Sequence, residues 1–166
     1  MHRSLKLKAA YGVYSYANSL FCKFLDLLPP FLRTLAFKFI FTEFGKGSSI
    51  DYGFKFRYGK KIVIGKNVTI SSSCEFYPGY FVRESKIYIG DHVTIGPAVM
   101  LIGAGHEPNS MNDIGGPIEI QDGVYIGARS LIRYGVTVGE NSTIAASSIV
   151  TKSIPPDTLF IQKYKS

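Results

Sequence analysis

The stretch PIEIQDGVYIGARSLIRYGVTVGENSTIAASSIV, residues 117–150, carries a branched aliphatic side chain at every sixth position. These positions are Ile120, Ile126, Ile132, Val138, Ile144 and Val150. Small or branched residues recur in the same phase two places earlier, at Val124, Ser130, Val136, Ser142 and Ser148. Because side chains two apart on a strand point to the same side, each unit is expected to be a short strand with an inward-facing pair, followed by a tight turn.

A single short strand cannot bury its inward face, but the stacked turns of a triangular coil can. Three six-residue units then make one coil, which places Ile126 under Ile144 and Ile132 under Val150. Glycine and asparagine supply the tight corners, at Gly65, Asn67, Gly90, Gly139 and Asn141. An ordinary sandwich would space its strands by about 8–12 residues without a fixed phase. The sequence therefore predicts a mainly β protein built as a parallel β-helix.

The same phase continues toward the N-terminus, at Ile64, Ile70 and Phe76 and then at Ile89, Ile95 and Leu101. The step from Val82 to Ile89 is seven, which predicts one inserted residue. A larger interruption falls at residues 103–117 (GAGHEPNSMNDIGGP), where turn residues replace the six-residue step. We expect this segment to form a loop outside the coil, and functional side chains concentrate in such loops.

Residues 1–44 differ from the rest of the chain, since they contain one glycine and show helical spacing of apolar residues. Apolar side chains recur at residues 20–28, Pro29-Pro30 interrupts them, and a second helix is predicted over residues 32–41. Two interpretations remain open: a helical cap on the coil, or an apolar and basic surface that touches a membrane. We favour the cap, because amphipathic helices more often face a core. The predicted organisation is therefore a cap over 1–44, a coil over 45–158 and a short tail over 159–166.

Composition narrows the classes of function. The 166 residues are enough for one domain, and 46% hydrophobic against 19% charged residues excludes disorder. Two cysteines, Cys22 and Cys74, are too few for a disulfide scaffold and fit a cytoplasmic setting. The net charge of +7 is spread along the chain without a basic arm, which favours a phosphorylated ligand or a membrane surface over nucleic acid. No segment is long and apolar enough to span a bilayer.

These segments resemble the hexapeptide-repeat acyltransferases, which form a left-handed parallel β-helix. More narrowly they resemble the maltose and galactoside O-acetyltransferases and their exopolysaccharide-modifying relatives. The resemblance covers residues 45–158 and lies in IVIGKNVTI (62–70), IGDHVTIGPAVMLIGAGHEPN (89–109) and PIEIQDGVYIGARSLIRYGVTVGENSTIAASSIVTKSIPPDT (117–158). It implies transfer of an acetyl group from acetyl-CoA to a saccharide hydroxyl by a homotrimer.

His106 is the candidate catalytic residue, because it lies in the interruption at 103–117. A neutral imidazole can take the proton of an attacking hydroxyl, and the resemblance implies this general-base role. The group that orients it stays open between Glu107, Glu75 and a backbone carbonyl. His92 falls in a predicted corner and is expected to be a solvated turn residue. A catalytic zinc needs three protein ligands, so no metal is expected.

The resemblance also implies where coenzyme A binds, along the outside of the coils between two subunits. Gly96 would lie near the thioester, and Ala128 and Ala146 would border the pantetheine arm. Thr151 and Lys152 would lie toward the nucleotide, where a lysine can meet a phosphate as a point charge. For the alanines the alternative is the packing of the repeat, and for Lys152 it is an ordinary solvated side chain.

The acceptor side is less determined. The resemblance places Ser71 where galactoside-type relatives have an asparagine, and a serine offers one donor where asparagine offers two. Glu75 and Tyr125 are the other candidate acceptor residues, and Tyr125 is predicted to point outward because it alternates with the inward pair. The C-terminal segment also departs from the family pattern, leaving Lys163 and Lys165 as candidates for the missing basic contact.

Two interpretations of the activity and two of the location follow. The leading one is an acetyl-CoA-dependent O-acetyltransferase with a saccharide acceptor. The alternative is a non-catalytic trimeric scaffold or sugar-binding module, which the histidine in the interrupting loop argues against. We expect a cytoplasmic protein, with weak contact between residues 1–44 and the inner face of the membrane as the further option.

Overall fold

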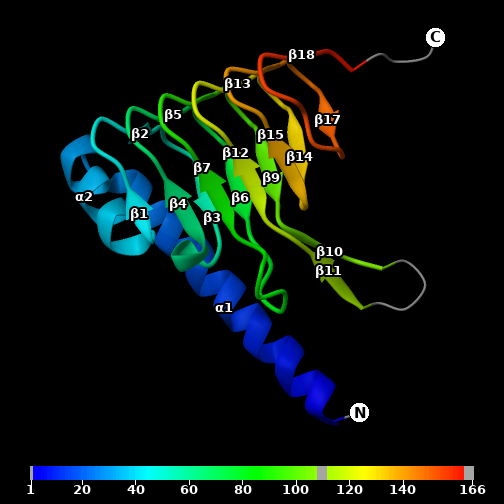
Figure 1. Cartoon of the computed structure of the whole chain (residues 1–166). Coiled ribbons are helices and arrows are strands. Elements are labelled where there is room, and N and C mark those ends of the chain that lie inside the picture. The colour runs from blue at the N-terminus through cyan, green and yellow to red at the C-terminus, as the bar shows by residue number, and fades with distance from the viewer. Residues whose placement is uncertain (1, 108–111, 163–166) are drawn as a thin grey trace.

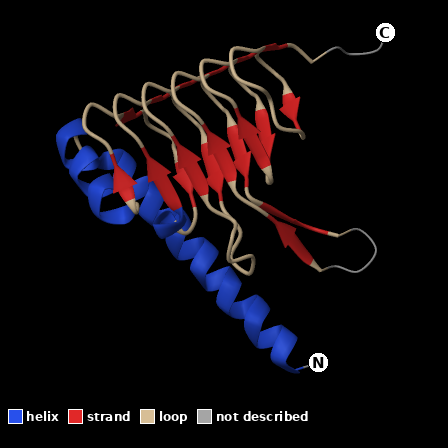
Figure 2. Cartoon of the chain, viewed as in Figure 1, coloured by secondary structure: helices blue, strands red, loops and turns tan. Residues whose placement is uncertain are grey.

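The computed structural model describes residues 2–107 and 112–162. Two helices, α1 (His2–Leu27) and α2 (Pro30–Ile40), come first, and short strands fill most of the remaining chain. The strands stack as the turns of a coil whose N-terminal end lies against the helices (Figure 1, Figure 2). The predicted second helix begins two residues earlier than expected, because a proline is favourable in the first turn of a helix.

Three parallel sheets form the sides of the coil. Sheet A consists of β1 (Glu43–Phe44), β4 (Ile62–Ile64), β7 (Ile87–Ile89), β12 (Ile118–Ile120) and β15 (Val136–Val138). Sheet B consists of β2 (Ser49–Ile50), β5 (Thr69–Ile70), β8 (Thr94–Ile95), β13 (Tyr125–Ile126), β16 (Thr143–Ile144) and β18 (Leu159–Phe160). Sheet C consists of β3 (Lys55–Phe56), β6 (Glu75–Tyr77), β9 (Met100–Ile102), β14 (Leu131–Arg133) and β17 (Ile149–Val150). The chain visits the sheets in the order A, B, C.

The register agrees with the six-residue phase. Ile126 pairs with Ile144 and Ile132 pairs with Val150, both in parallel. The inward side chains of the repeat are 0–2% exposed from Ile62 to Ile144. Two buried serines of the same row donate to backbone: the Ser142 Oγ to the carbonyl of Pro155 at 2.8 Å and the Ser130 Oγ to that of Ala145 at 3.1 Å. Among the described residues, the buried Ser148 Oγ has no such partner. Each coil therefore contributes one layer to a continuous apolar core.

The corner between sheets A and B needs a left-handed backbone residue in successive coils. Asn67 (φ 54°), His92 (φ 57°) and Asn141 (φ 55°) occupy equivalent corners. Asparagine and histidine are among the residues that tolerate this conformation best. His92 is exposed there, as expected for a solvated turn residue.

The interruption between the second and third coils is longer than predicted. Ile64 pairs with Ile89 in the next coil. One coil of three six-residue units separates them, together with an insertion of seven residues, where the sequence had predicted an insertion of one. Val82 lies in this excursion and not in the core row. Lys61 holds the segment, because its Nζ donates to the carbonyls of Gly79 at 2.5 Å and Val82 at 2.9 Å. Val82 lies six residues after Phe76, which matches the repeat by coincidence.

The first coil is closed by a cluster of aromatic side chains from α2 and the strands that follow. Phe37, Phe41 and Phe54 are 1–2% exposed, and the Phe37 and Phe41 rings stack at 5.3 Å. Arg33, 3% exposed, donates to the carbonyl of Ile50 at 2.8 Å and pairs with Asp26 at 3.0 Å. A buried guanidinium needs such partners, so Arg33 joins both helices to the first coil.

The cap interpretation expected the apolar side chains of α1 to pack on the coil, but only some of them do. Leu25 is 3% exposed and Cys22 is 6% exposed, whereas Leu20, Phe24 and Leu27 are 49%, 55% and 82% exposed. The side of α1 that touches the coil is partly polar, since the Asn18 side chain donates to the carbonyl of Phe56 at 2.7 Å. Helical spacing identified the helix, but it could not tell which side packs. Within the described residues, neither helix meets the length and apolarity needed to cross a bilayer.

Alkaline pH is expected to destabilise the fold through Cys74 and Tyr77. Burial raises the pKa of the Cys74 thiol from 9.0 to about 11, and burial together with the nearby Glu75 charge raises that of Tyr77 to about 12. Both groups stay neutral in the folded chain at pH values where the unfolded chain ionises them. Their contribution is complete below about pH 8.5 and is lost as pH rises through the folded values.

The check is a series of thermal unfolding temperatures from pH 7 to pH 11. We expect little change up to pH 8 and a progressive fall between pH 9 and pH 11. In Cys74→Ala the unfolding temperature at pH 7 should be lower, but its decrease between pH 9 and pH 11 should be smaller. An equally steep fall in that variant would show that the thiol is not responsible.

Candidate functional site

His106 lies on a two-stranded antiparallel ribbon that leaves the coil between sheets C and A. Its strands are β10 (Ala104–His106) and β11 (Asp113–Gly115), and the ribbon projects from the body of the molecule (Figure 1). The sequence predicted a loop outside the coil over 103–117, and the structure shows paired strands within this segment, which make it a hairpin. Four residues of that segment, 108–111, lie outside the described residues.

The base of the hairpin is anchored to the preceding excursion by Ser85, which is fully buried. The Ser85 Oγ accepts from the backbone N–H of Gly79 at 2.6 Å and donates to the carbonyl of Gly103 at 2.7 Å. A Cβ on Gly103 would lie 2.5 Å from that hydroxyl oxygen. Glycine is therefore required here, and the anchor fixes the direction in which β10 leaves the coil.

The histidine faces a carboxylate across the hairpin. His106 is in register with Asp113, and its Nδ1 lies 3.1 Å from Asp113 Oδ1. The two side chains are 62% and 38% exposed, so solvent still reaches the pair. Asp113 was missed in the sequence because a hairpin was not predicted there. Had 103–117 been treated as a ribbon, cross-strand pairing would have proposed Asp113 as the partner.

The other candidate orienting groups are placed differently. Glu75 lies on the outer side of sheet C, where its Oε1 accepts from Lys55 Nζ at 2.9 Å, and Glu75 raises the pKa of that lysine. Glu107 follows His106 along the same strand direction, and its backbone N–H donates to the carbonyl of Asn112 at 2.9 Å. Asp113, which lies across the hairpin, pairs with His106 in the same chain.

A hollow of about 260 Å³ borders His106, and aromatic side chains form part of its wall. Its lining includes His106, Asp113, Arg57 and the aromatic side chains Tyr58, Tyr77, Tyr80 and Phe81. The Tyr58 and Tyr80 rings lie 5.2 Å apart, and Arg57 lies over the Tyr77 ring at 5.3 Å. Apolar walls with a few polar groups are typical of small-molecule sites.

The predicted cofactor residues Gly96, Ala128 and Ala146 lie at the corner between sheets B and C, with Ser71. Gly96 is buried, and a Cβ there would lie 2.8 Å from the backbone nitrogen of Ala128. The repeat therefore requires glycine at position 96 for packing alone. Ala146 is exposed, and Ala128 is partly exposed. A corner lined by such small side chains leaves the backbone open to a ligand.

The remaining predicted residues lie elsewhere on the coil. Thr151 and Lys152 are exposed after β17, on the same side of sheet C as the His106 hairpin. Tyr125 is 46% exposed on the outer side of sheet B, so it points outward as expected. One chain thus places the predicted catalytic and cofactor residues at the two edges of sheet C, and Tyr125 on sheet B, rather than gathering them into one pocket.

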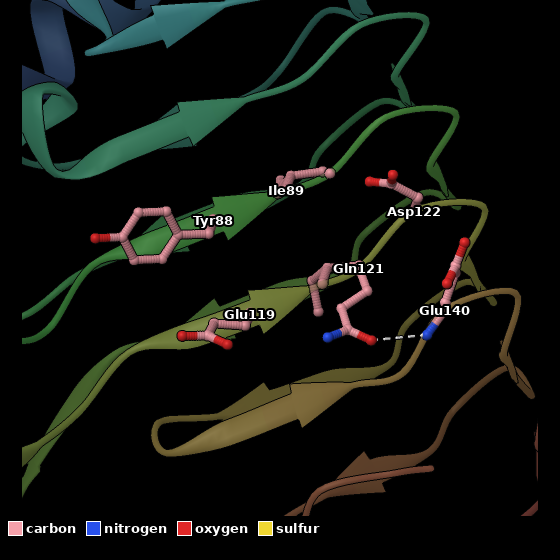
Figure 3. A pocket seen from close by; sticks show the side chains of 8 residues that line it. Tyr88, Ile89, Glu119, Gln121, Asp122 and Glu140 are labelled. Carbon is pink, nitrogen blue, oxygen red and sulfur yellow. Dashed lines mark hydrogen bonds between the residues drawn. The ribbon is translucent and has the colours of Figure 1, made fainter. Parts of the chain in front are cut away.

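A wider hollow of about 600 Å³ lies on sheet A and does not include any of these residues. Figure 3 shows Glu119, Asp122 and Glu140 around it, with Gln121 accepting from the backbone N–H of Glu140 at 3.0 Å. Three carboxylates would repel the phosphates of a nucleotide cofactor, so this surface does not suit one. Across the part of the chain that the structure describes, no group of His, Cys, Asp and Glu is placed to hold a metal.

Comparison with known proteins gives the family. The family model for the bacterial transferase hexapeptide (six repeats) matches residues 117–152. A hexapeptide-repeat acetyltransferase of Vibrio cholerae, solved in complex with acetyl coenzyme A, is 32% identical, with a TM-score of 0.73 over 82% of this chain and 77% of that one. This chain belongs to the hexapeptide-repeat acyltransferases. Its predicted fold, a left-handed parallel β-helix with N-terminal helices, is confirmed.

Two further relatives carry the names of acceptors. The galactoside O-acetyltransferase of Escherichia coli is 36% identical over 76% of this chain and 63% of its own length. A maltose O-acetyltransferase from Clostridium difficile is 30% identical, with a TM-score of 0.72 over 86% of this chain and 80% of that one. This chain spans between 52% and 63% of the length of the first curated relatives that it matches.

Proposed function

We propose that this hexapeptide-repeat acyltransferase moves an acetyl group from acetyl-CoA to a hydroxyl of a saccharide. The observation that carries the proposal is the His106–Asp113 pair at 3.1 Å, held on a ribbon beside an aromatic hollow. The names of the relatives, which include galactoside and maltose O-acetyltransferases, support the donor and the class of acceptor. A scaffold without turnover would not need a paired histidine on a ribbon of its own.

In the proposed reaction His106 acts as a general base. Its Nδ1–H donates to Asp113, which leaves Nε2 with a lone pair to take the proton of the acceptor hydroxyl. The hydroxyl oxygen attacks the thioester carbonyl carbon, a C–O bond forms, and the C–S bond breaks. The proton held on Nε2 then passes to the coenzyme A thiolate, so atoms and charge balance.

We propose that coenzyme A lies along the corner between sheets B and C. Gly96 would be near the thioester, and Ala128 and Ala146 would border the pantetheine arm, because small side chains allow a ligand to approach the backbone. Thr151 and Lys152 lie on the opposite edge of sheet C in the same chain. They can serve the nucleotide end of a cofactor bound to this corner only if another copy brings them there.

A homotrimer would bring the two edges together. The outer side of sheet C is largely apolar at its C-terminal end, where Met100 and Leu131 are partly exposed and Ile149 is 51% exposed. If three coils turn this sheet toward a common axis, the edge between sheets B and C of one copy meets the His106 edge of the next. Ligand sites commonly lie at such boundaries.

For the acceptor we propose the hollow beside His106, whose aromatic walls can pack against the apolar side of a sugar ring. Ser71 lines a different hollow, together with Arg33 and Tyr52. Ser71, Glu75 and Tyr125 would therefore act on a sugar bound at a neighbouring copy's hairpin. The acceptor assignment rests on the hairpin pocket and not on these three.

Asp113→Asn is expected to reduce the turnover number by about tenfold, and the Michaelis constant for acetyl-CoA should change little. The carboxylate is partly exposed, and exposed ion pairs are weak, so the loss should be smaller than for the histidine itself. Rescue provides the positioning readout, since Asp113→Glu keeps a carboxylate that can accept from Nδ1 and should recover most of the lost turnover. Full activity in Asp113→Asn would show that Asp113 does not act on His106.

The function itself is tested by release of free coenzyme A thiol in the presence of a panel of sugars. Acceptor-dependent release, with an acetylated sugar detected by mass spectrometry, supports the transferase. Saturable sugar binding without thiol release would instead support the sugar-binding module. The acetylated product also distinguishes an ester on oxygen from an amide on an amino sugar.

A further inference from the structure

An apolar stripe runs along the side of α1 that faces away from the coil. Val13, Tyr16, Leu20, Phe24 and Leu27 follow one another at intervals of three and four residues, which places them on one side of a helix. They are 71%, 69%, 49%, 55% and 82% exposed. Scattered exposed apolar residues are ordinary, but a continuous stripe marks an interaction surface.

The second helix carries an apolar side of its own. Phe31, Leu35 and Phe39 are 71%, 50% and 72% exposed, whereas Arg33 and Phe37 of the same helix are buried. Both helices therefore bury one side in the first coil and present the other. We call the exposed apolar residues of the two helices the outer apolar surface. Its members are Val13, Tyr16, Leu20, Phe24, Leu27, Phe31, Leu35 and Phe39.

The charges beside the outer apolar surface are basic. Lys23 on α1 and Lys38 on α2 are exposed among its members. Asp26 is already paired with Arg33 at 3.0 Å and accepts from the backbone N–H of Gly53 at 3.1 Å. Residues 1–44 contain six basic and two acidic residues. An apolar stripe flanked by lysines matches a helix that lies in the headgroup region of an anionic bilayer.

We infer that the outer apolar surface docks this protein on an anionic lipid surface. Phenylalanine and tyrosine make up four of the members named above, Tyr16, Phe24, Phe31 and Phe39, and aromatic rings are favoured at the boundary between headgroups and acyl chains. Figure 1 shows the N-terminal part of α1 extending away from the sheets of the coil. The helix lies on the membrane and does not cross it. This inference does not depend on the proposed reaction.

The geometry also favours lipid over a second copy as the occupant. If copies associate through the outer side of sheet C, their coil axes run parallel, and all N-terminal helices lie at the same end of the assembly. Several outer apolar surfaces then face one plane together. Linked sites on a common plane bind more tightly than one alone, which suits a bilayer.

The experiment is co-sedimentation of the full chain with vesicles of phosphatidylglycerol and phosphatidylcholine in equal amounts, and with vesicles of phosphatidylcholine alone. We expect binding to the mixed vesicles and little to the neutral ones. Lys23→Glu should weaken binding by about fivefold or more, since each basic residue near the surface contributes about that factor. Raising the salt concentration should weaken it in parallel.

Phe24→Ser and Leu27→Ser test the apolar contribution, and each is expected to reduce vesicle binding at least tenfold. Leu159→Ser, at a residue that is 65% exposed on β18, is the matched control and should bind like the unchanged protein. Thermal unfolding of each variant checks that the fold is kept. Binding that is the same for all variants would overturn the proposal. A smaller oligomer for Phe24→Ser in lipid-free light scattering would overturn it too, in favour of a second copy.

Discussion

His106→Ala is expected to lower the turnover number by about 10²–10⁴-fold, the usual contribution of a general base. Affinity for coenzyme A should hardly change, because the proposed cofactor contacts come from Gly96, Ala128, Ala146, Thr151 and Lys152 and not from His106. The variant is also expected to fold normally, since the side chain is 62% exposed and its hairpin is anchored by Ser85 and not by His106. The measurement is steady-state thiol release at saturating acetyl-CoA, with coenzyme A binding followed by calorimetry.

His92→Ala is the control for this prediction. His92 occupies an exposed corner between sheets A and B with φ 57°, in a row where other coils have asparagine. Its replacement should leave turnover within about twofold and cost some stability, because alanine tolerates a left-handed backbone poorly. Equal losses in the two variants would mean that the hairpin histidine has no special role.

The six-residue phase was sufficient to predict the coil, because each step of the repeat is a physical layer. Ile126 and Ile144 pair directly, as do Ile120 and Val138, and both registers follow from that spacing. The corner role of His92 was predictable for the same reason. Periodicity failed where the chain leaves the coil. Val82 fell in phase by chance, and the hairpin could not be told from a loop because β10 and β11 have no repeat.

The helices show a second limit of the sequence. Apolar spacing over residues 20–28 identified α1, yet Leu25 is buried while Leu27 is 82% exposed. The side that packs on the coil combines the buried Cys22 and Leu25 with polar contacts, such as Asn18 to the carbonyl of Phe56 and Asp26 to Arg33. Apolar spacing alone does not separate such a mixed inner side from an exposed apolar outer side.

Within one chain, the His106 edge and the Gly96 edge of sheet C are too far apart to share one reaction. A side of the coil holds about five extended residues, so its two edges lie about 15 Å apart at roughly 3.3 Å per residue. Reacting groups must come within about 3.5 Å of one another. A thioester near Gly96 is therefore out of reach of His106 in the same chain. The proposed reaction requires that two copies supply the two edges.

Mixed trimers test this arrangement directly. His106→Ala disables one edge, and Ala146→Glu disables the other, because a larger, negatively charged side chain at this exposed corner excludes a phosphorylated cofactor. Each variant alone should lose at least about 100-fold in activity. When the two are co-expressed with different tags and trimers carrying both are purified, each such trimer contains one intact site out of three. About a third of the unmodified activity should return, whereas a site contained within one chain would leave the mixed trimers as inactive as either variant.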